Sequence, residues 1–274
     1  MINIIFSTVI YKTPNYVLNR LIASINNLKE EFDNTYPENY EIKLLVIDNS
    51  NCLEEKILDK LKEKYKFEIS FFISKKNLGY GMGHNKNLLK LEPDKNTWYV
   101  ALNPDIYFEG KEVINYFKYI TSNQEIKCSA PLIILPNGDI QYSAKKNPTF
   151  ISLLVSRFSF FQKIYILKKY LNINQNRSKN YKKEFIETSF LSGCFLTFPS
   201  DLYFKIGGFS NKYFLHFEDA DIVRRCSKEG LTIHCPYGKV THVRGRGSHK
   251  SLSQQIHLLN SYIKYSKIWG FRFF

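Results

Sequence analysis

Apolar runs of strand length alternate with helical spacing over the first hundred residues. Residues 2–10, 42–47 and 67–74 are short β-branched or apolar runs that end at polar residues or proline, which predicts buried strands. Between the first two runs, apolar residues recur every three or four positions from Val17 to Leu28, which predicts a helix with one face on a sheet. Similar spacing covers residues 53–61. This βαβαβ order with short connections predicts a parallel sheet and a Rossmann-like α/β fold.

The run at residues 98–106, WYVALNPDI, carries the first candidate chemistry. Proline cannot continue a central strand, so the strand should end at Asn103 and place Asp105 at the carboxyl edge of the sheet. Ligands of open α/β sheets bind outside that edge, where a carboxylate can hold a divalent cation against a phosphate. The alternative is a turn closed by an Asx-type hydrogen bond, and both interpretations stay open at this point.

Two further polar stretches follow predicted strands, as Asp105 does. Asp48 follows the second strand, where it can accept hydrogen bonds from a base or ribose, or instead cap a helix. Residues 77–85, NLGYGMGHN, have glycines at alternate positions but match neither a dinucleotide fingerprint nor a P-loop. We expect a loop whose backbone approaches a ligand closely, followed by a helix over residues 85–91 whose N-terminus favours an anion; a flexible loop is the alternative.

The second half adds a hairpin, a basic helical segment and a polar loop. Residues 131–143 should form a hairpin around Pro136-Asn137-Gly138-Asp139. Residues 150–167 place a broad apolar side among lysines and Arg157, which is typical of a helix at a membrane interface or of a core helix with a basic outer face. Residues 172–183 are polar enough for a mobile loop, and residues 189–199 form a strand-like run broken at Ser192-Gly193.

Three acidic residues, Glu218, Asp219 and Asp221, crowd the first turn of a helix predicted to begin near residue 218. Helix capping explains one or two of them, and a carboxylate cluster beside a metal-binding crevice could also hold a general base. His242 stands at another expected strand end, before Arg244 and Arg246. A histidine in that position fits metal and diphosphate binding.

Composition narrows the class of protein. At 274 residues and 44% hydrophobic, the chain suits one large α/β domain, or a domain with a small appendage. Five scattered cysteines without CxxC spacing argue against a disulfide framework and a zinc site, and favour a reducing cytoplasm. The first residues lack the basic region of a signal peptide, and no uncharged apolar run reaches about 18 residues, so we expect no membrane-spanning segment.

The net charge of +14 is concentrated in two segments that contain no Asp or Glu, residues 140–183 and 230–274. Basic residues mixed with aromatic ones indicate an anionic partner: a phospholipid surface, a pyrophosphate or a nucleic acid. A solvated basic face is the alternative. A nucleic-acid partner would explain the charge but gives no purpose to carboxylates at strand ends, so we expect none.

The order of these motifs resembles glycosyltransferase family 2, the inverting GT-A glycosyltransferases, and most of all its bacterial rhamnosyltransferase branch. The motifs are Asp48 after a strand, NLGYGMGHN, NPDI, SGCF, GGF, FEDAD and a later His242. The resemblance covers residues 2–249, a GT-A domain with a nucleotide-sugar half at 1–105 and an acceptor half at 106–249 that includes a basic insert at 150–183. Residues 250–274 would form a C-terminal amphipathic helix and an aromatic, basic tail.

The resemblance implies roles for the matching residues. Asp219 corresponds to the catalytic base, supported by Glu218, and Asp105 and His242 would bind Mg²⁺ or Mn²⁺. Asn103 replaces the first acid of the family's DXD element, which leaves Asp105 as the only sure carboxylate ligand. The acceptor side would include Ser192, Gly193 and Asp221. The donor pocket would include Ser7, Val9, Tyr11, Asp48, Asn77, Gly79, Asn85, Asn103, Asp105, Arg244 and Arg246.

The implied reaction is one in-line displacement with inversion, in bacterial surface polysaccharide synthesis. The donor would be dTDP-rhamnose and the acceptor a saccharide on a polyprenyl diphosphate, at the inner face of the cell membrane. A UDP-hexose or UDP-galactofuranose donor, or a non-catalytic nucleotide-sugar-binding homologue, would keep the same motifs. Trp269, Phe271, Phe273 and Phe274 beside Lys267 and Arg272 suit peripheral attachment to an anionic membrane, with packing in a homodimer as the competing interpretation.

Overall fold

The computed structural model describes residues 1–51, 61, 64–65, 67–158, 160–243 and 252–274. The helix expected over residues 53–61 lies outside the described residues except for Leu61, which is helical. Arg244 and Arg246 also lie outside them.

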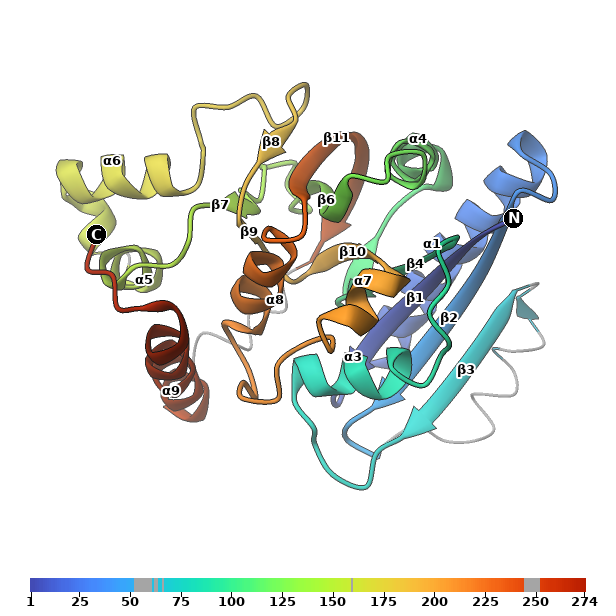
Figure 1. Ribbon diagram of the computed structural model, residues 1–274, viewed down its shortest axis with the longest axis horizontal. Helices are drawn as coiled ribbons and strands as arrows, with labels where there is room; N and C mark the ends of the chain where they lie inside the picture. The colour runs from blue at the N-terminus through green and yellow to red at the C-terminus, as the bar shows by residue number, and fades with distance from the viewer. Residues whose placement is uncertain (52–60, 62–63, 66, 159, 244–251) are drawn as a thin grey trace.

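A mixed sheet crosses the molecule in the order β3-β2-β1-β4-β10-β6-β11-β5, with β8 added beside β11 (Figure 1). The long strands run in one direction: β1 (Ile2–Ile10), β2 (Tyr40–Asp48), β3 (Glu68–Ile73), β4 (Thr97–Leu102), β6 (Ile126–Ile134) and β11 (Leu231–His242). Antiparallel to them are β10 (Phe195–Pro199), β5 (Ile106–Tyr107) and β8 (Ile186–Glu187). A small second sheet joins β7 (Ala144–Lys145) to β9 (Phe190–Leu191).

Helices cover both faces of this sheet because side chains alternate along each strand. On one face, Phe6, Leu44 and Val100 pack against α1 (Asn15–Thr35) and α4 (Gly110–Thr121). On the other, Leu45 and Ala101 pack against α3 (Tyr80–Leu88), α7 (Ser200–Lys205) and α8 (Glu218–Cys226). The predicted class, a mostly parallel α/β sheet flanked by helices, is confirmed.

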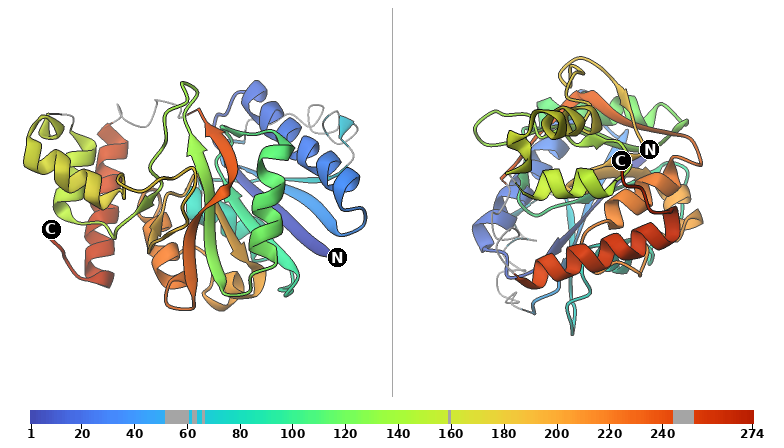
Figure 2. Two further views of the ribbon diagram at one scale, coloured as in Figure 1. Left: turned by 90° about the horizontal axis from the view of Figure 1, so that it is seen from above. Right: turned by 90° about the vertical axis from the view of Figure 1, so that its left-hand side faces the viewer.

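Four further elements lie beyond α8: α5 (Phe150–Arg157), a 3₁₀ turn η1 (Phe161–Lys163), α6 (Tyr165–Asn174) and α9 (Leu252–Trp269). A third cluster of buried residues joins two of them, α5 and α9, to α8. Tyr213, Phe217, Tyr262 and Tyr265 are buried there together with Ala220 of α8. Figures 1 and 2 show α5, α6 and the C-terminus at the end of the molecule away from β3. The predicted C-terminal helix is therefore present, and it packs against the element that carries the acidic cluster.

Three local predictions need correction. The glycine stretch at 77–85 is a loop only as far as Gly79, because α3 begins at Tyr80 and includes the later glycines. The expected hairpin has its turn at residues 135–139, but its return strand is reduced to one bridge between Ile134 and Ile140. The single helix expected over 150–167 is broken after Arg157, and α6 extends into the stretch expected to be a mobile loop.

Candidate active site

The polar residues from separate strand ends meet in one cavity of about 1400 Å³. Asn103, Asp105 and His242 line it from the sheet edge, and Asp219 lines it from the start of α8. The opposite wall comes from α5, η1 and α6. The cavity is larger than the usual volume of a small-ligand site, about 300–1000 Å³, and so has room for two substrates.

Asp105 and His242 form the candidate metal pair. The Oδ1 atom of Asp105 lies 3.3 Å from Nε2 of His242, and β5 pairs with β11 at this point, so the backbone holds the two residues together. Gln141 is buried behind the imidazole and accepts a hydrogen bond from its Nδ1 at 2.8 Å. This contact leaves Nε2 directed at Asp105, the arrangement that a ligating histidine needs.

These residues fit a divalent cation as a partial site. Burial alone lowers the pKa of His242, but the Cys194 sulfur and the Asp105 carboxylate raise it to about 10. A bound cation would replace the proton that the pair shares. Among the described residues no three His, Cys, Asp or Glu side chains converge, so the other ligands would have to come from a substrate diphosphate and water.

Asp219 is fixed from both sides of its carboxylate. Its Oδ2 accepts a hydrogen bond from the backbone N–H of Gly193 at 2.9 Å, and its Oδ1 accepts one from the N–H of Ala220 at 2.8 Å. A Cβ at position 193 would lie 2.9 Å from the Cβ of Asp219, so only glycine allows this approach. His216 and Phe217, just before α8, both adopt left-handed backbone conformations, with φ of 70° and 66°. Such strain concentrates at functional sites.

Glu218 and Asp219 are adjacent carboxyl groups in different environments. Burial, and then the neighbouring charge of Asp219, raise the pKa of Glu218 to about 8, although two backbone N–H groups oppose the shift. Among the described residues, its Oε2 atom has no hydrogen-bond partner. Asp219 is only half-buried and lines the cavity, so it is the carboxyl group of the pair that a substrate in this cavity can reach.

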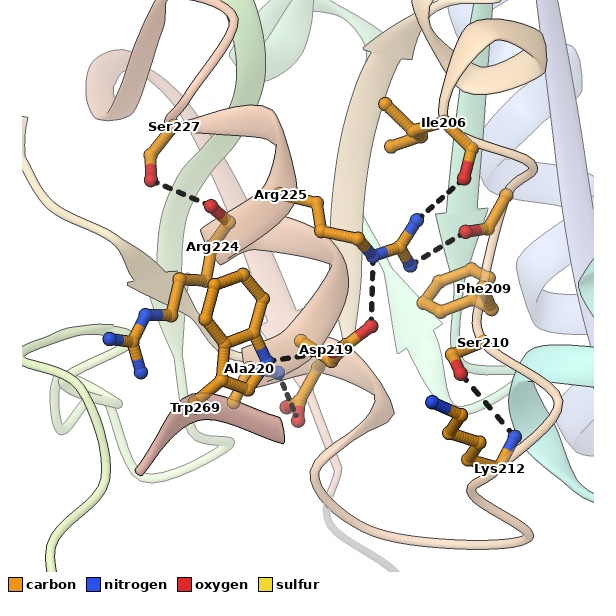
Figure 3. A network of polar contacts seen from close by, with 12 residues as sticks. Ile206, Phe209, Ser210, Lys212, Asp219, Ala220, Arg224, Arg225, Ser227 and Trp269 are labelled. Atoms are coloured by element: carbon orange, nitrogen blue, oxygen red, sulfur yellow. Dashed lines mark hydrogen bonds and ion pairs between the residues drawn. The ribbon is translucent and has the colours of Figure 1, made fainter. Parts of the chain in front are cut away.

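Asp221 has a different position from the acceptor-side one that we expected. It is almost fully buried, and its two oxygens accept hydrogen bonds from Nε of Arg225 at 2.9 Å and Nε1 of Trp269 at 2.8 Å. Arg225 also donates to the carbonyls of Ile206 and Gly208 at 2.7 Å (Figure 3). Asp221 does not line the cavity. It ties α8 to α9 and to the loop after α7. Ser192 is also buried, with its N–H bonded to Ser143.

Two residues predicted for the donor pocket prove to be internal. Ser7 is fully buried under α3, where its hydroxyl contacts Nδ1 of His84 at 2.8 Å and accepts a hydrogen bond from Asn87 at 3.0 Å. Asn85 accepts hydrogen bonds from Tyr203 and the N–H of Phe209, and donates to the carbonyl of Phe209. Their side chains therefore hold α3 in place, and a part of the Ser7 backbone or of Asn85 in donor binding stays a prediction.

The remaining donor-side residues lie at or just after the carboxyl ends of β1, β2 and β3. Asp48 is buried and accepts a hydrogen bond from the N–H of Ser50 at 2.7 Å, as a capping carboxylate does. Asn77 accepts one from the N–H of Gly79, whose φ of 79° suits glycine. Tyr11 is 52% exposed, and Val9 packs closely against Gly83 of α3. Their part in donor binding stays a prediction.

Sequence reasoning missed several residues of the cavity. Gln141 and His216 line it, and the Tyr80 hydroxyl donates to the carbonyl of Gly193, on the turn that holds Asp219. The order of residues along the chain contains no signal for Gln141, because its partner lies 101 positions away. His216 stands two residues before Glu218, and its proximity to the acidic cluster could have drawn attention to it.

No family model matches the chain, but individual relatives do. An N-acetylglucosaminyl-diphospho-decaprenol L-rhamnosyltransferase of Mycobacterium tuberculosis is 26% identical over 180 residues, 61% of this chain and 56% of the relative. The rhamnosyltransferase WbbL of Escherichia coli K12 is 25% identical over 162 residues, 57% of each chain. The chain is therefore similar in sequence to rhamnosyltransferases. The matched stretch spans little more than half the length of either relative.

The chain shares its fold with solved glycosyltransferase structures. GalNAc-T7, determined with UDP, GalNAc and Mn²⁺, superposes with a TM-score of 0.69 at 16% identity, covering 98% of this chain and 48% of that one. TarS (1–349) of S. aureus gives 0.58 at 12% identity, covering 98% and 74%. The GT-A fold expected from the motifs is confirmed.

We expect Glu218 to make stability depend on pH. An acid whose pKa is raised on folding, here from 4.5 to about 8, loses its proton first in the unfolded chain. The free energy of unfolding should therefore fall as pH rises from about 4.5 to 8. Urea unfolding of wild type and Glu218→Gln across this range should show a shallower fall in the variant. Parallel pH profiles for the two proteins would contradict a buried, protonated Glu218.

Replacing Gln141 should weaken metal binding without touching a ligand. Gln141→Leu removes the acceptor that orients His242, and losses of this kind cost about 10–100-fold in metal affinity. Mn²⁺ binding in the presence of a nucleoside diphosphate can be followed by electron paramagnetic resonance. Gln124→Leu, on an exposed surface, is the matched control. An unchanged Mn²⁺ affinity in folded Gln141→Leu would remove His242 from the metal site.

Proposed function

We propose that the chain is an inverting glycosyltransferase that moves a sugar from a nucleoside diphosphate to a saccharide hydroxyl. The observation that carries the proposal is that the Asp219 carboxylate and the Asp105–His242 pair line one cavity. A displacement at the anomeric carbon needs a base for the acceptor hydroxyl and a cation at the leaving diphosphate. Asp219 on one wall can act as the base, and the Asp105–His242 pair at the sheet edge can hold the cation. Retention of both carboxylates argues against a non-catalytic homologue.

Asp219 would take the proton of the acceptor hydroxyl as that oxygen attacks the anomeric carbon. The bond from this carbon to the diphosphate oxygen breaks in the same step, so the configuration inverts. The Gly193 and Ala220 N–H groups hold the Asp219 carboxylate in place. Buried Glu218 keeps its own proton near neutral pH and so leaves the base role to Asp219. Mg²⁺ or Mn²⁺, held by Asp105 and His242, would neutralise charge on the leaving diphosphate.

The relatives support a choice of substrates. Both are named rhamnosyltransferases, and the name of the mycobacterial protein includes a decaprenol diphosphate that carries N-acetylglucosamine. We therefore propose dTDP-rhamnose as the donor and a saccharide on a polyprenyl diphosphate as the acceptor, with UDP-hexose and UDP-galactofuranose as alternative donors. The reaction would take place at the inner face of the cell membrane.

A donor screen tests the proposal, and Asp219→Asn tests the base. Purified protein with Mn²⁺ and a panel of nucleotide sugars should show protection against thermal unfolding by one donor class. Asp219→Asn keeps the size and most hydrogen bonding, so donor protection should persist while transfer falls at least about a hundredfold. Ser210→Ala, on the loop outside the cavity, is the control. Wild-type turnover by Asp219→Asn would assign the base elsewhere.

A basic, aromatic face supports peripheral attachment to an anionic membrane. The α5–α6 face comprises the exposed Phe158, Phe160, Ile164, Tyr165, Ile166, Phe271, Phe273 and Phe274, with Lys163, Lys168, Lys169 and Arg272 exposed among them. The carbonyls of Arg272 and Phe273 accept hydrogen bonds from the N–H groups of Phe150 and Ile151, which fixes the tail on α5. No helix in the described part of the chain could span a membrane.

We expect the chain to sediment with anionic vesicles and not with neutral ones, and to be released by high salt. Charge attraction to a bilayer is screened over about 10 Å at 0.1 M salt. Phe160→Ser/Tyr165→Ser should weaken binding, whereas Tyr16→Ser, 70% exposed on α1, should not. Equal binding to neutral vesicles would exclude the electrostatic part. A variant that binds vesicles normally but dissociates a dimer would assign the face to a homodimer.

A further inference from the structure

We propose that Lys145, Arg157 and Arg177 form a subsite for the diphosphate of the acceptor. This subsite is separate from the Asp105–His242 pair, which would hold the metal at the donor diphosphate. This inference rests on the proposed function and adds the residues that would bind the diphosphate of the acceptor. The three residues come from different elements: β7, the last residue of α5, and the turn after α6. All three line the cavity that contains Asp105 and Asp219.

Amide side chains and aromatic rings contact these cations. Arg157 donates from Nε to Oε1 of Gln255 at 3.1 Å, and Arg177 donates from Nε to Oε1 of Gln175 at 2.8 Å. The Arg177 guanidinium also lies 4.7 Å from the Tyr142 ring centre, and the Lys145 ammonium 5.0 Å from that of Phe190. Guanidinium groups held at Nε are suited to bind phosphate through their outer N–H groups.

The charge of this part of the cavity is one-sided. Residues 140–183, which supply the three cations, contain no Asp or Glu. The acids that line the cavity are Asp105 at the sheet edge, Asp219 at the start of α8, and Asp139 on the turn after β6, where Asn137 donates to it. The three cations line the cavity from other elements than the Asp105–His242 pair, and they therefore offer a second place for a diphosphate.

The position of the cluster matches a lipid-linked substrate. Arg157 is the last residue of α5 and Arg177 follows α6, and the exposed Phe158, Phe160 and Tyr165 of the α5–α6 face lie between them in the chain. A saccharide reaching toward Asp219 would thus leave its diphosphate at the cations and its hydrocarbon chain at that face. A glycoside without a diphosphate would lack the contact with Lys145, Arg157 and Arg177.

Calorimetric titration of the complete chain with geranyl diphosphate in EDTA tests the subsite, because EDTA removes the metal that a donor diphosphate requires. Arg157→Gln/Arg177→Gln should weaken binding at least about tenfold, the scale of losing charged hydrogen bonds. Lys182→Gln/Lys183→Gln, two exposed cations of the same acid-free segment that do not line the cavity, should bind as wild type does. Absence of geranyl diphosphate binding by wild type would overturn the proposal.

Two further ligands identify the source of the phosphate. Binding of dTDP with Mn²⁺ should be equal in wild type and Arg157→Gln/Arg177→Gln; an equal loss for dTDP and geranyl diphosphate would assign the arginines to the donor. Dihexanoyl phosphatidylglycerol should not depend on them, and an equal loss there would make them headgroup contacts. If no nucleotide sugar protects wild type with Mn²⁺ while the arginine-dependent diphosphate binding persists, the proposed function fails and the subsite stands.

Discussion

The contact between the N–H of Gly193 and the Asp219 carboxylate joins the two halves of the candidate active site. Gly193 lies between β9 and β10, and β10 is the antiparallel strand that separates the nucleotide-side strands from β6 and β11. Because a side chain at position 193 would collide with Asp219, the sheet and α8 can meet only through glycine here. The position of Asp219 relative to Asp105 thus depends on one close backbone approach.

The three acidic residues at the start of α8 differ in burial and therefore in what they can do. Glu218 is enclosed and its pKa is raised to about 8, Asp221 is enclosed but satisfied by Arg225 and Trp269, and Asp219 is the one of the three that lines the cavity. A carboxylate that loses its partners inside a protein costs far more than one at the surface. The first turn of α8 therefore combines a structural anchor with a reactive group, and α9 belongs to that anchor through Trp269.

The small helices beyond α8 give the site its second wall. Without α5 and α6, the Asp105–Asp219 cavity would open directly to solvent on that side, since those helices supply Leu153, Ser156 and Leu171 to its lining. Cations and amides of this segment also line the cavity, and its exposed aromatics face solvent. Such a segment can link a water-soluble donor to a substrate held in lipid.

The alternation of apolar runs and helical spacing determined the α/β class, the strand ends at Asp48 and His242 and shortly before Asp105, and the acidic start of α8, because these depend on local periodicity and on proline and glycine. The order of the motifs was enough to indicate the family resemblance. Only the tertiary structure decided which polar side chains face a cavity. Ser7, Asn85 and Asp221 are polar residues in suggestive positions, but their partners are His84, Phe209 and Trp269, up to 124 residues away. Gln141 reaches His242 across 101 residues. A hydrogen bond to a ligand and one to a distant backbone or side chain require the same residue types, so the sequence alone could not separate them.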